Sequence, residues 1–148
     1  MSQMASASVN RDFTMTNPPQ NWIDPSSAFV VRIMPGDDDE GADMSVPPAL
    51  CDAPAHMAEA QGAPWRNETL VSFMRSQTCR QCVVLSHTAS AFATGLAVMG
   101  LEYGFDTFFV IADLDVLSRD LFTRLQQTGA RLFSAARFAQ ECALAWRQ

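Results

Sequence analysis

The chain has 148 residues, of which 48% are hydrophobic and 18% charged, so it can bury the core of one domain. Its formal net charge is −6, and all ten basic residues are arginine. Phosphate binding requires clustered positive charge, so we expect no nucleic-acid contact. No apolar run reaches the roughly 18 residues of a bilayer-spanning helix, so we expect no membrane span.

The first 27 residues are polar and rich in turn formers, with "TNPPQNW" followed by "DPSS". We expect an extended or disordered arm over residues 1–27, with Trp22 and Ile23 as its anchor. Residues 28–148 then form a single domain. Its first element is a strand over Ala28–Met34, because "AFVVRIM" is apolar, rich in β-branched residues and followed by Pro-Gly.

A long loop is predicted over residues 36–66, which contain several prolines and little periodicity. Four consecutive acidic residues occupy positions 37–40. Carboxylates in a row repel one another, so they indicate a solvated loop rather than a metal site. A stretch of this length without elements is unusual in a compact domain, so we expect residues 36–64 to cross the surface or contact a protein partner.

Helices and strands alternate from Asn67 to the end of the chain. The strands are predicted over Gln81–Ser86, Asp106–Ala112 and residues 130–134. Helices are predicted after the capping residues Asn67, Ser118 and Ser134 and over residues 89–103. In the last helix Phe138, Cys142 and one of Leu144 and Ala145 are expected to face inward. Buried strands that alternate with helices predict an α/β fold: a Rossmann-like three-layer α/β/α sandwich with a mainly parallel sheet and a truncated or irregular N-terminal part.

Ligands of open parallel sheets bind at the carboxyl ends of the strands. Here the stretch "VVLSHTASAFATG" begins as a buried strand, turns at this edge and then opens a helix. The candidate site residues are therefore His87, Thr88, Ser90 and Ala91 in the turn, together with Asp113 after the next strand.

Four cysteines are present, and we interpret them as reduced thiols of an intracellular protein in the cytoplasm or an organellar matrix such as the mitochondrial one. Cys79 and Cys82, in "CRQC", have the spacing of a zinc or redox pair. The chain has no second close pair, and this one lies at the opposite end of its strand from Ser86. Cys82 is therefore interpreted as a small core residue, with a metal site as the weaker alternative.

Five segments stand in the order and spacing of known motifs and cover about the last 80 residues. They are "NETL" at 67–70, "CVVLSHTASAF" at 82–92, "YGFDTFFVIADL" at 103–114, "LSRD" at 117–120 and "TGARLF" at 128–133. Together they resemble the isochorismatase-like cysteine hydrolase family. The resemblance implies hydrolysis of amide, carbamoyl or vinyl-ether bonds by an aspartate, a lysine and a cysteine at a helix N-terminus.

The resemblance places none of these three groups on a matching residue. Thr88 matches the family's threonine, and three residues later the cysteine position falls on Ala91. A shift by one residue puts Ser90 there, without an evident base. The chain has no lysine. If Ala28–Met34 is the family's first strand, Ile33 replaces the aspartate; if it is the second strand, the first is absent.

The resemblance also bears on the two remaining site residues. His87 stands where the family has a small glycine, so we expect its ring to fill part of the pocket. Asp113 corresponds to a residue with a largely structural role. We therefore expect a non-catalytic member without a cofactor that serves as a structural or assembly subunit of a homo- or hetero-oligomer. Its partners would contact helix 89–103 and segments 1–27 and 36–64.

Two further hypotheses belong to other classes of function. One is a hydrolase of the same family that acts on C–N or C–O bonds with an unusual or shared active site. The other is a zinc or redox protein that uses Cys79 and Cys82.

Overall fold

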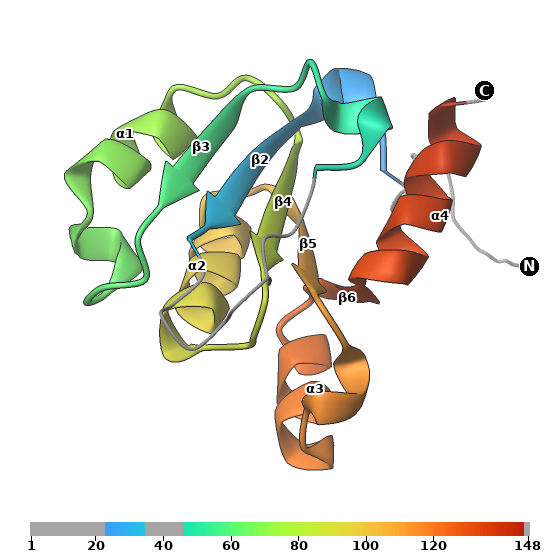
Figure 1. Cartoon of the computed structure of the whole chain (residues 1–148). Coiled ribbons are helices and arrows are strands. Elements are labelled where there is room, and N and C mark those ends of the chain that lie inside the picture. The colour runs from blue at the N-terminus through green and yellow to red at the C-terminus, as the bar shows by residue number, and fades with distance from the viewer. Residues whose placement is uncertain (1–22, 35–45, 147–148) are drawn as a thin grey trace, which may run out of the picture.

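The computed structural model describes residues 23–34 and 46–146, and they form a five-stranded sheet in the order β3-β2-β4-β5-β6 (Figure 1). Every neighbouring pair of strands is parallel. The strands are β2 (Ala28–Ile33), β3 (Ala55–Ala58), β4 (Gln81–Ser86), β5 (Asp106–Ile111) and β6 (Arg131–Ser134). The helices are α1 (Glu68–Arg75), α2 (Ala91–Glu102), α3 (Arg119–Gln127) and α4 (Ala135–Trp146). The predicted α/β fold with a parallel sheet is confirmed.

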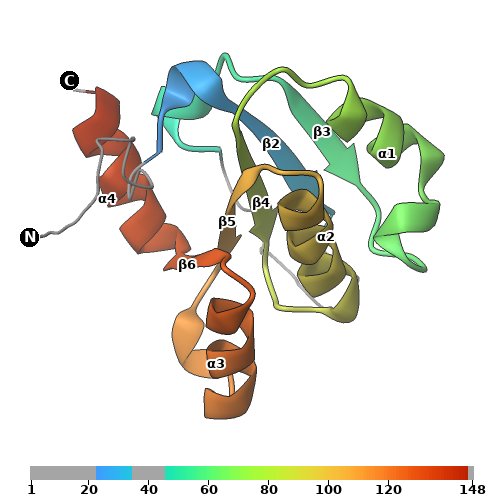
Figure 2. The same ribbon diagram turned by 180° about the vertical axis from the view of Figure 1, so that it is seen from behind.

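Both faces of the sheet are covered, because side chains of a strand alternate between its two faces. In β4, Cys82 and Val84 join a core under α1 and α2, whereas Val83 and Leu85 join a second core under α4. Figure 2 shows α1 and α2 in front of the sheet, and α3 lies beyond the carboxyl ends of the strands (Figures 1 and 2). None of the described helices is long and apolar enough to cross a bilayer.

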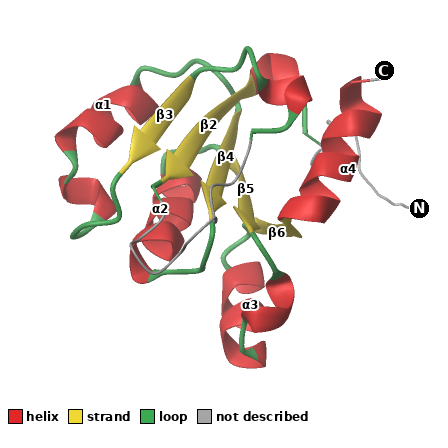
Figure 3. Ribbon diagram, viewed as in Figure 1, coloured by secondary structure: helices red, strands yellow, loops and turns green. Residues whose placement is uncertain are grey.

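The sequence predicts a loop over residues 36–66, but the described part of this segment also contains regular structure. Its described part, residues 46–66, contains β3 and two short 3-10 helices, η2 (Pro48–Leu50) and η3 (Pro64–Arg66) (Figure 3). β3 pairs with β2 from Val30 opposite Ala55 to Ile33 opposite Ala58. Its sequence, "AHMA", has no β-branched residue, so strand propensity gives no signal and the pairing with β2 defines the strand.

The last residues of the predicted arm, 23–27, are folded. Residues 1–22, including Trp22, lie outside the described part of the chain. Ile23 is fully buried in the core under α4, and the Asp24 backbone N–H donates to Gln81 Oε1 at 2.6 Å. Pro25–Ser27 form the short 3-10 helix η1. Residues 23–27 therefore belong to the folded domain.

The predicted helix caps agree with the structure. Asn67, Ser118 and Ser134 each accept a hydrogen bond from a backbone N–H in the first turn of α1, α3 and α4. Ser90, which was not predicted as a cap, accepts one in the first turn of α2. The helix predicted over 89–103 accordingly begins at Ala91.

In α4, Phe138 and Cys142 are buried as expected, but Leu144 is 57% exposed, so the expectation that it could face inward is wrong. Two residues after Cys142, it points to the opposite side of a helix.

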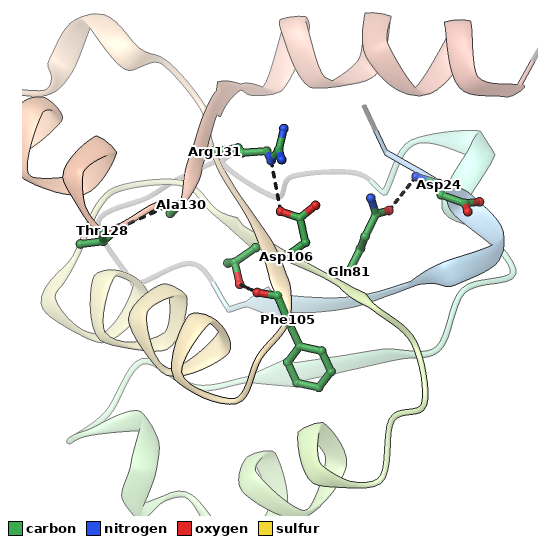
Figure 4. A network of polar contacts seen from close by, with 8 residues as sticks. Asp24, Gln81, Phe105, Asp106, Thr128, Ala130 and Arg131 are labelled. Carbon is green, nitrogen blue, oxygen red and sulfur yellow. Dashed lines mark hydrogen bonds and ion pairs between the residues drawn. The ribbon is translucent and has the colours of Figure 1, made fainter. Parts of the chain in front are cut away.

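Polar contacts join the amino ends of the strands (Figure 4). Arg131 Nε donates to Asp106 Oδ1 at 3.1 Å, and the Arg131 guanidinium carbon lies 5.6 Å from the centre of the Phe108 ring. Gln81 accepts from Asp24 at the same edge. These contacts lie at the opposite edge of the sheet from the carboxyl ends, where a ligand is expected.

We predict that Gly100→Ala lowers stability whereas Gly95→Ala, in the same helix, leaves it nearly unchanged. A Cβ on Gly100 would lie 2.8 Å from Oγ1 of the fully buried Thr107. Overpacking costs about 1–3 kcal/mol and the gain in helix propensity returns about 1, so we expect a net loss of about 1 kcal/mol. Urea unfolding of both variants measures the difference.

The Gly95 variant is the matched control. Its new Cβ would lie 3.3 Å from Pro64 Cγ and 3.5 Å from Trp65 Cζ3, which are longer contacts than the 2.8 Å at Gly100, and the gain in helix propensity offsets their cost. Equal losses in the two variants would contradict the proposed contact with Thr107.

Candidate functional site

Two hydrogen bonds to backbone carbonyls fix the conformation of the turn after β4. Ser86 is buried and its hydroxyl donates to the Thr88 carbonyl at 2.6 Å. The His87 carbonyl accepts from the Ala112 N–H at 3.3 Å, which ties the turn to the end of β5. His87 is half-buried and Thr88 is exposed. These contacts shape the turn without using an imidazole, thiol or carboxylate.

Ser90 and Ala91 stand at the N-terminus of α2. The Ser90 side chain accepts from the Ala93 N–H at 3.1 Å, so its oxygen caps the helix. Ala91 is the first residue of the helix and is exposed. A helix N-terminus lowers the pKa of a cysteine placed there, but this position presents only a methyl group.

Asp113 lies at the end of β5, at the same edge as the turn. Its side chain accepts from the Asp115 N–H at 2.9 Å and caps the short 3-10 helix η4 (Leu114–Val116). This is a local structural contact. The sheet thus brings Asp113 to the same edge as His87, while the hydrogen bond of Asp113 with the Asp115 N–H stays within its own loop.

The strand beside the turn is β2, because β2 pairs directly with β4. Its carboxyl end carries Ile33, which is 9% exposed, and Met34, which is 44% exposed. The described residues at this end therefore supply apolar side chains where a base would have to stand. The acidic residues 37–40 lie outside the described part of the chain.

The cysteines do not form a metal site in the described structure. Cys82 is fully buried and faces α2, and burial raises the pKa of its thiol far above the ordinary range. Cys79 is half-buried just before β4. Among the described residues, no three His, Cys, Asp or Glu side chains are grouped closely enough to hold a metal ion.

A pocket that the sequence analysis missed lies where β3 leads toward α1. Its volume is about 370 Å³, and its lining residues are Glu59, Gln61, Gly62, Ala63, Trp65, Arg66 and Asn67. Trp65 is 62% exposed, and the Pro64 and Trp65 rings lie against Gly95 of α2. The pocket follows the carboxyl end of β3, so it lies at the edge where parallel sheets bind ligands. The lining residues directly follow β3, so the pocket could not be predicted while this segment was interpreted as a loop.

Comparison with known proteins identifies the fold. No protein-family model and no curated protein matches the chain. Among solved structures, the YcaC gene product of Escherichia coli, described as an octameric hydrolase of unknown specificity, superposes with a TM-score of 0.58 at 18% identity over 88% of this chain and 86% of its own. YcaC from Pseudomonas aeruginosa, solved with hexane-2,5-diol and covalent acrylamide, gives a TM-score of 0.56 at 18% identity over 86% and 85%. The chain therefore has the fold of these hydrolases, in agreement with the isochorismatase-like resemblance.

We predict that the free energy of unfolding falls between pH 9 and about pH 12. Burial, followed by the nearby Glu141 carboxylate, raises the pKa of Cys142 from 9.0 to about 12. The folded state keeps this proton after the unfolded chain has lost it, so the contribution is complete below pH 9 and is lost as the pH rises toward 12. The slope is up to about 1.4 kcal/mol per pH unit for each such thiol.

Urea unfolding at several pH values above 8 measures this slope. The chain has no lysine, which leaves few other groups to titrate in this range. Cys142→Ala is the control and should show a shallower decline. Equal slopes for the two proteins would contradict a buried neutral thiol at Cys142.

Proposed function

We propose that this protein is a non-catalytic member of the fold shared with YcaC and serves as a structural or assembly subunit of a homo- or hetero-oligomer. The observation that carries the proposal is the start of α2. The position that corresponds to the family's nucleophile holds Ala91, which is exposed and has no reactive group. The chain also has no lysine to lower the pKa of a thiol.

The other groups near this position support the same proposal. The Ser90 side-chain oxygen caps α2, and its hydroxyl hydrogen bonds to no His or carboxylate within the described residues. The end of β2 is apolar at Ile33 and Met34. Cys82 is buried in the core with a raised pKa, so its thiol is neutral near pH 7. Covalent hydrolysis requires an activated nucleophile, and these residues do not supply one.

Assembly is supported by the surface of α2 and by the fold relative. The helix, "AFATGLAVMGLE", has apolar residues on nearly all sides, and Val98 and Leu101 are only half-buried. A helix of this composition is typically covered by more than one neighbour. The E. coli protein of this fold is octameric. We propose that residues 89–103 contact partners, together with segments 1–27 and 36–64.

The alternative is a hydrolase with an unusual site, and the pocket around Trp65 favours it. Glu59 and Arg66 supply a carboxylate and a guanidinium beside the exposed indole. The pocket could bind a small polar ligand with an aromatic or amide group.

The proposal predicts an oligomer without hydrolase activity. Native mass spectrometry and light scattering of the full chain should give a mass above that of the monomer, which is 16.2 kDa. Amide, carbamoyl and vinyl-ether substrates should be hydrolysed no faster than in buffer. An active member of the family serves as the positive control for the assay.

Two results would contradict this. A stable monomer at all concentrations would overturn assembly. Turnover that is lost in Trp65→Ala and kept in Leu144→Ala, a second exposed apolar residue, would overturn the non-catalytic assignment and locate the site in the pocket.

A further inference from the structure

The outer edge of β3 presents unpaired backbone groups. β3 is the last strand on its side of the sheet and pairs only with β2 (Figure 1). The Val30 N–H donates to the Pro54 carbonyl and the Met34 N–H to the Ala58 carbonyl, both at 2.8 Å. Alternate residues of a strand direct their backbone groups to opposite sides, so Ala55 and Met57 direct theirs outward. Within residues 23–34 and 46–146, no hydrogen bond reaches these outward groups.

β3 itself lacks the charged side chain, the internal proline and the bulge that usually prevent strand addition. Natural edge strands are blocked by charged side chains, internal proline, bulges or a covering element. β3 reads "AHMA", without a charge or a proline, and it keeps a regular register with β2. Ala55 is exposed and Met57 is 44% exposed, so a second strand can approach.

We propose that β3 pairs in antiparallel fashion with β3 of a second copy, around a two-fold axis through His56, so that one sheet continues through both copies. This inference rests on the proposed assembly function and names the partner. In this register Ala55 lies opposite the partner's Met57, and Met57 lies opposite the partner's Ala55. Directly opposed residues of this kind exchange both of their backbone hydrogen bonds. The unpaired groups of both edges are therefore satisfied at once.

The side chains also fit a second copy. Ala55 and Met57 share one face of the strand, where a small residue then opposes a flexible thioether that fills irregular space. His56 lies on the other face, and its ring stacks on Phe73 of α1 at 5.1 Å between ring centres. This stacking turns the imidazole toward α1, so it leaves the edge open.

The octameric state of E. coli YcaC, which shares this fold, supports a second copy of the chain as the partner of β3. An octamer with dihedral symmetry contains two-fold axes and more than one kind of contact between copies. A strand pair of this length buries too little surface to hold a dimer alone, because stable interfaces bury about 800 Å² per partner. The pairing of β3 is therefore one contact of an assembly to which α2 also contributes.

The first test compares Met57→Glu with Leu144→Glu in the full chain. Both replace an exposed apolar residue by the same charge, but Leu144 lies on α4, on the opposite side of the sheet. Glutamate is chosen because Met57 lies beside Arg32 of β2, which a lysine would repel. A charged side chain on an edge strand opposes the addition of a second strand, so we expect Met57→Glu to weaken association at least about ten-fold and to lower the assembly mass in native mass spectrometry. Leu144→Glu should keep the wild-type mass.

The outcomes separate the two proposals. A wild-type monomer would overturn both assembly and strand pairing. A wild-type oligomer whose mass does not change in Met57→Glu would overturn strand pairing alone. Equal dissociation of the two variants would also overturn it, because charge rather than position would be the cause.

The second test fixes the register and does not depend on the Met57 variant remaining folded. In a Cys51→Ser background, which removes an exposed thiol, His56→Cys should give a disulfide-linked dimer under mild oxidation. Two residues on the two-fold axis have Cα atoms about 4.5 Å apart, within the range of a disulfide. Ala55→Cys is the control, because its copies lie diagonally, about 7–8 Å apart. A wild-type oligomer in which His56→Cys gives no dimer, or less dimer than Ala55→Cys, would overturn the proposed pairing.

Discussion

The burial of β4 on both faces is the constraint on which the remaining structure depends. All six of its residues are buried, with α2 packed on one face and α4 on the other. Its first residue, Gln81, is polar, and the Asp24 N–H satisfies its side-chain oxygen. A strand enclosed in this way has one register with its neighbours, because a slip by one residue would exchange the two cores. The turn after Ser86 is therefore held at the carboxyl edge, next to β2 and β5.

The contacts that shape this turn do not depend on a reactive side chain. The hydrogen bonds that shape it involve the Ser86 hydroxyl and backbone carbonyls, and Ser90 caps α2. A cap of this kind contributes about 1 kcal/mol to stability. Alanine at the first position of a helix has the best intrinsic helix propensity. A nucleophile at position 91 would add chemistry to this turn, whereas its absence costs the local structure nothing.

Much of this architecture was predictable, because local patterns encode it. The apolar runs of β4 and β5 and the caps at Asn67, Ser118 and Ser134 are visible in a few adjacent residues. The turn residues from His87 to Ala91 are adjacent in the sequence, so their proximity could be predicted without knowing the fold. β3 and the pocket were missed for the opposite reason. "AHMA" becomes a strand only through its pairing with a distant segment, and the pocket around Trp65 exists only once β3 has set the path of the chain.

Two features of the surface favour contact with a second copy. Val98 and Leu101 of α2 are only half-buried, and burial of apolar surface stabilises an assembly by about 25 cal/mol per Å². The outer edge of β3 presents backbone N–H and C=O groups that can hydrogen bond to a second strand in place of water. The four residues of β3 include no charged side chain that would block this edge. Both features favour contact between copies, so they support the association that we propose, and Ala91 at the start of α2 supports the proposed absence of hydrolysis.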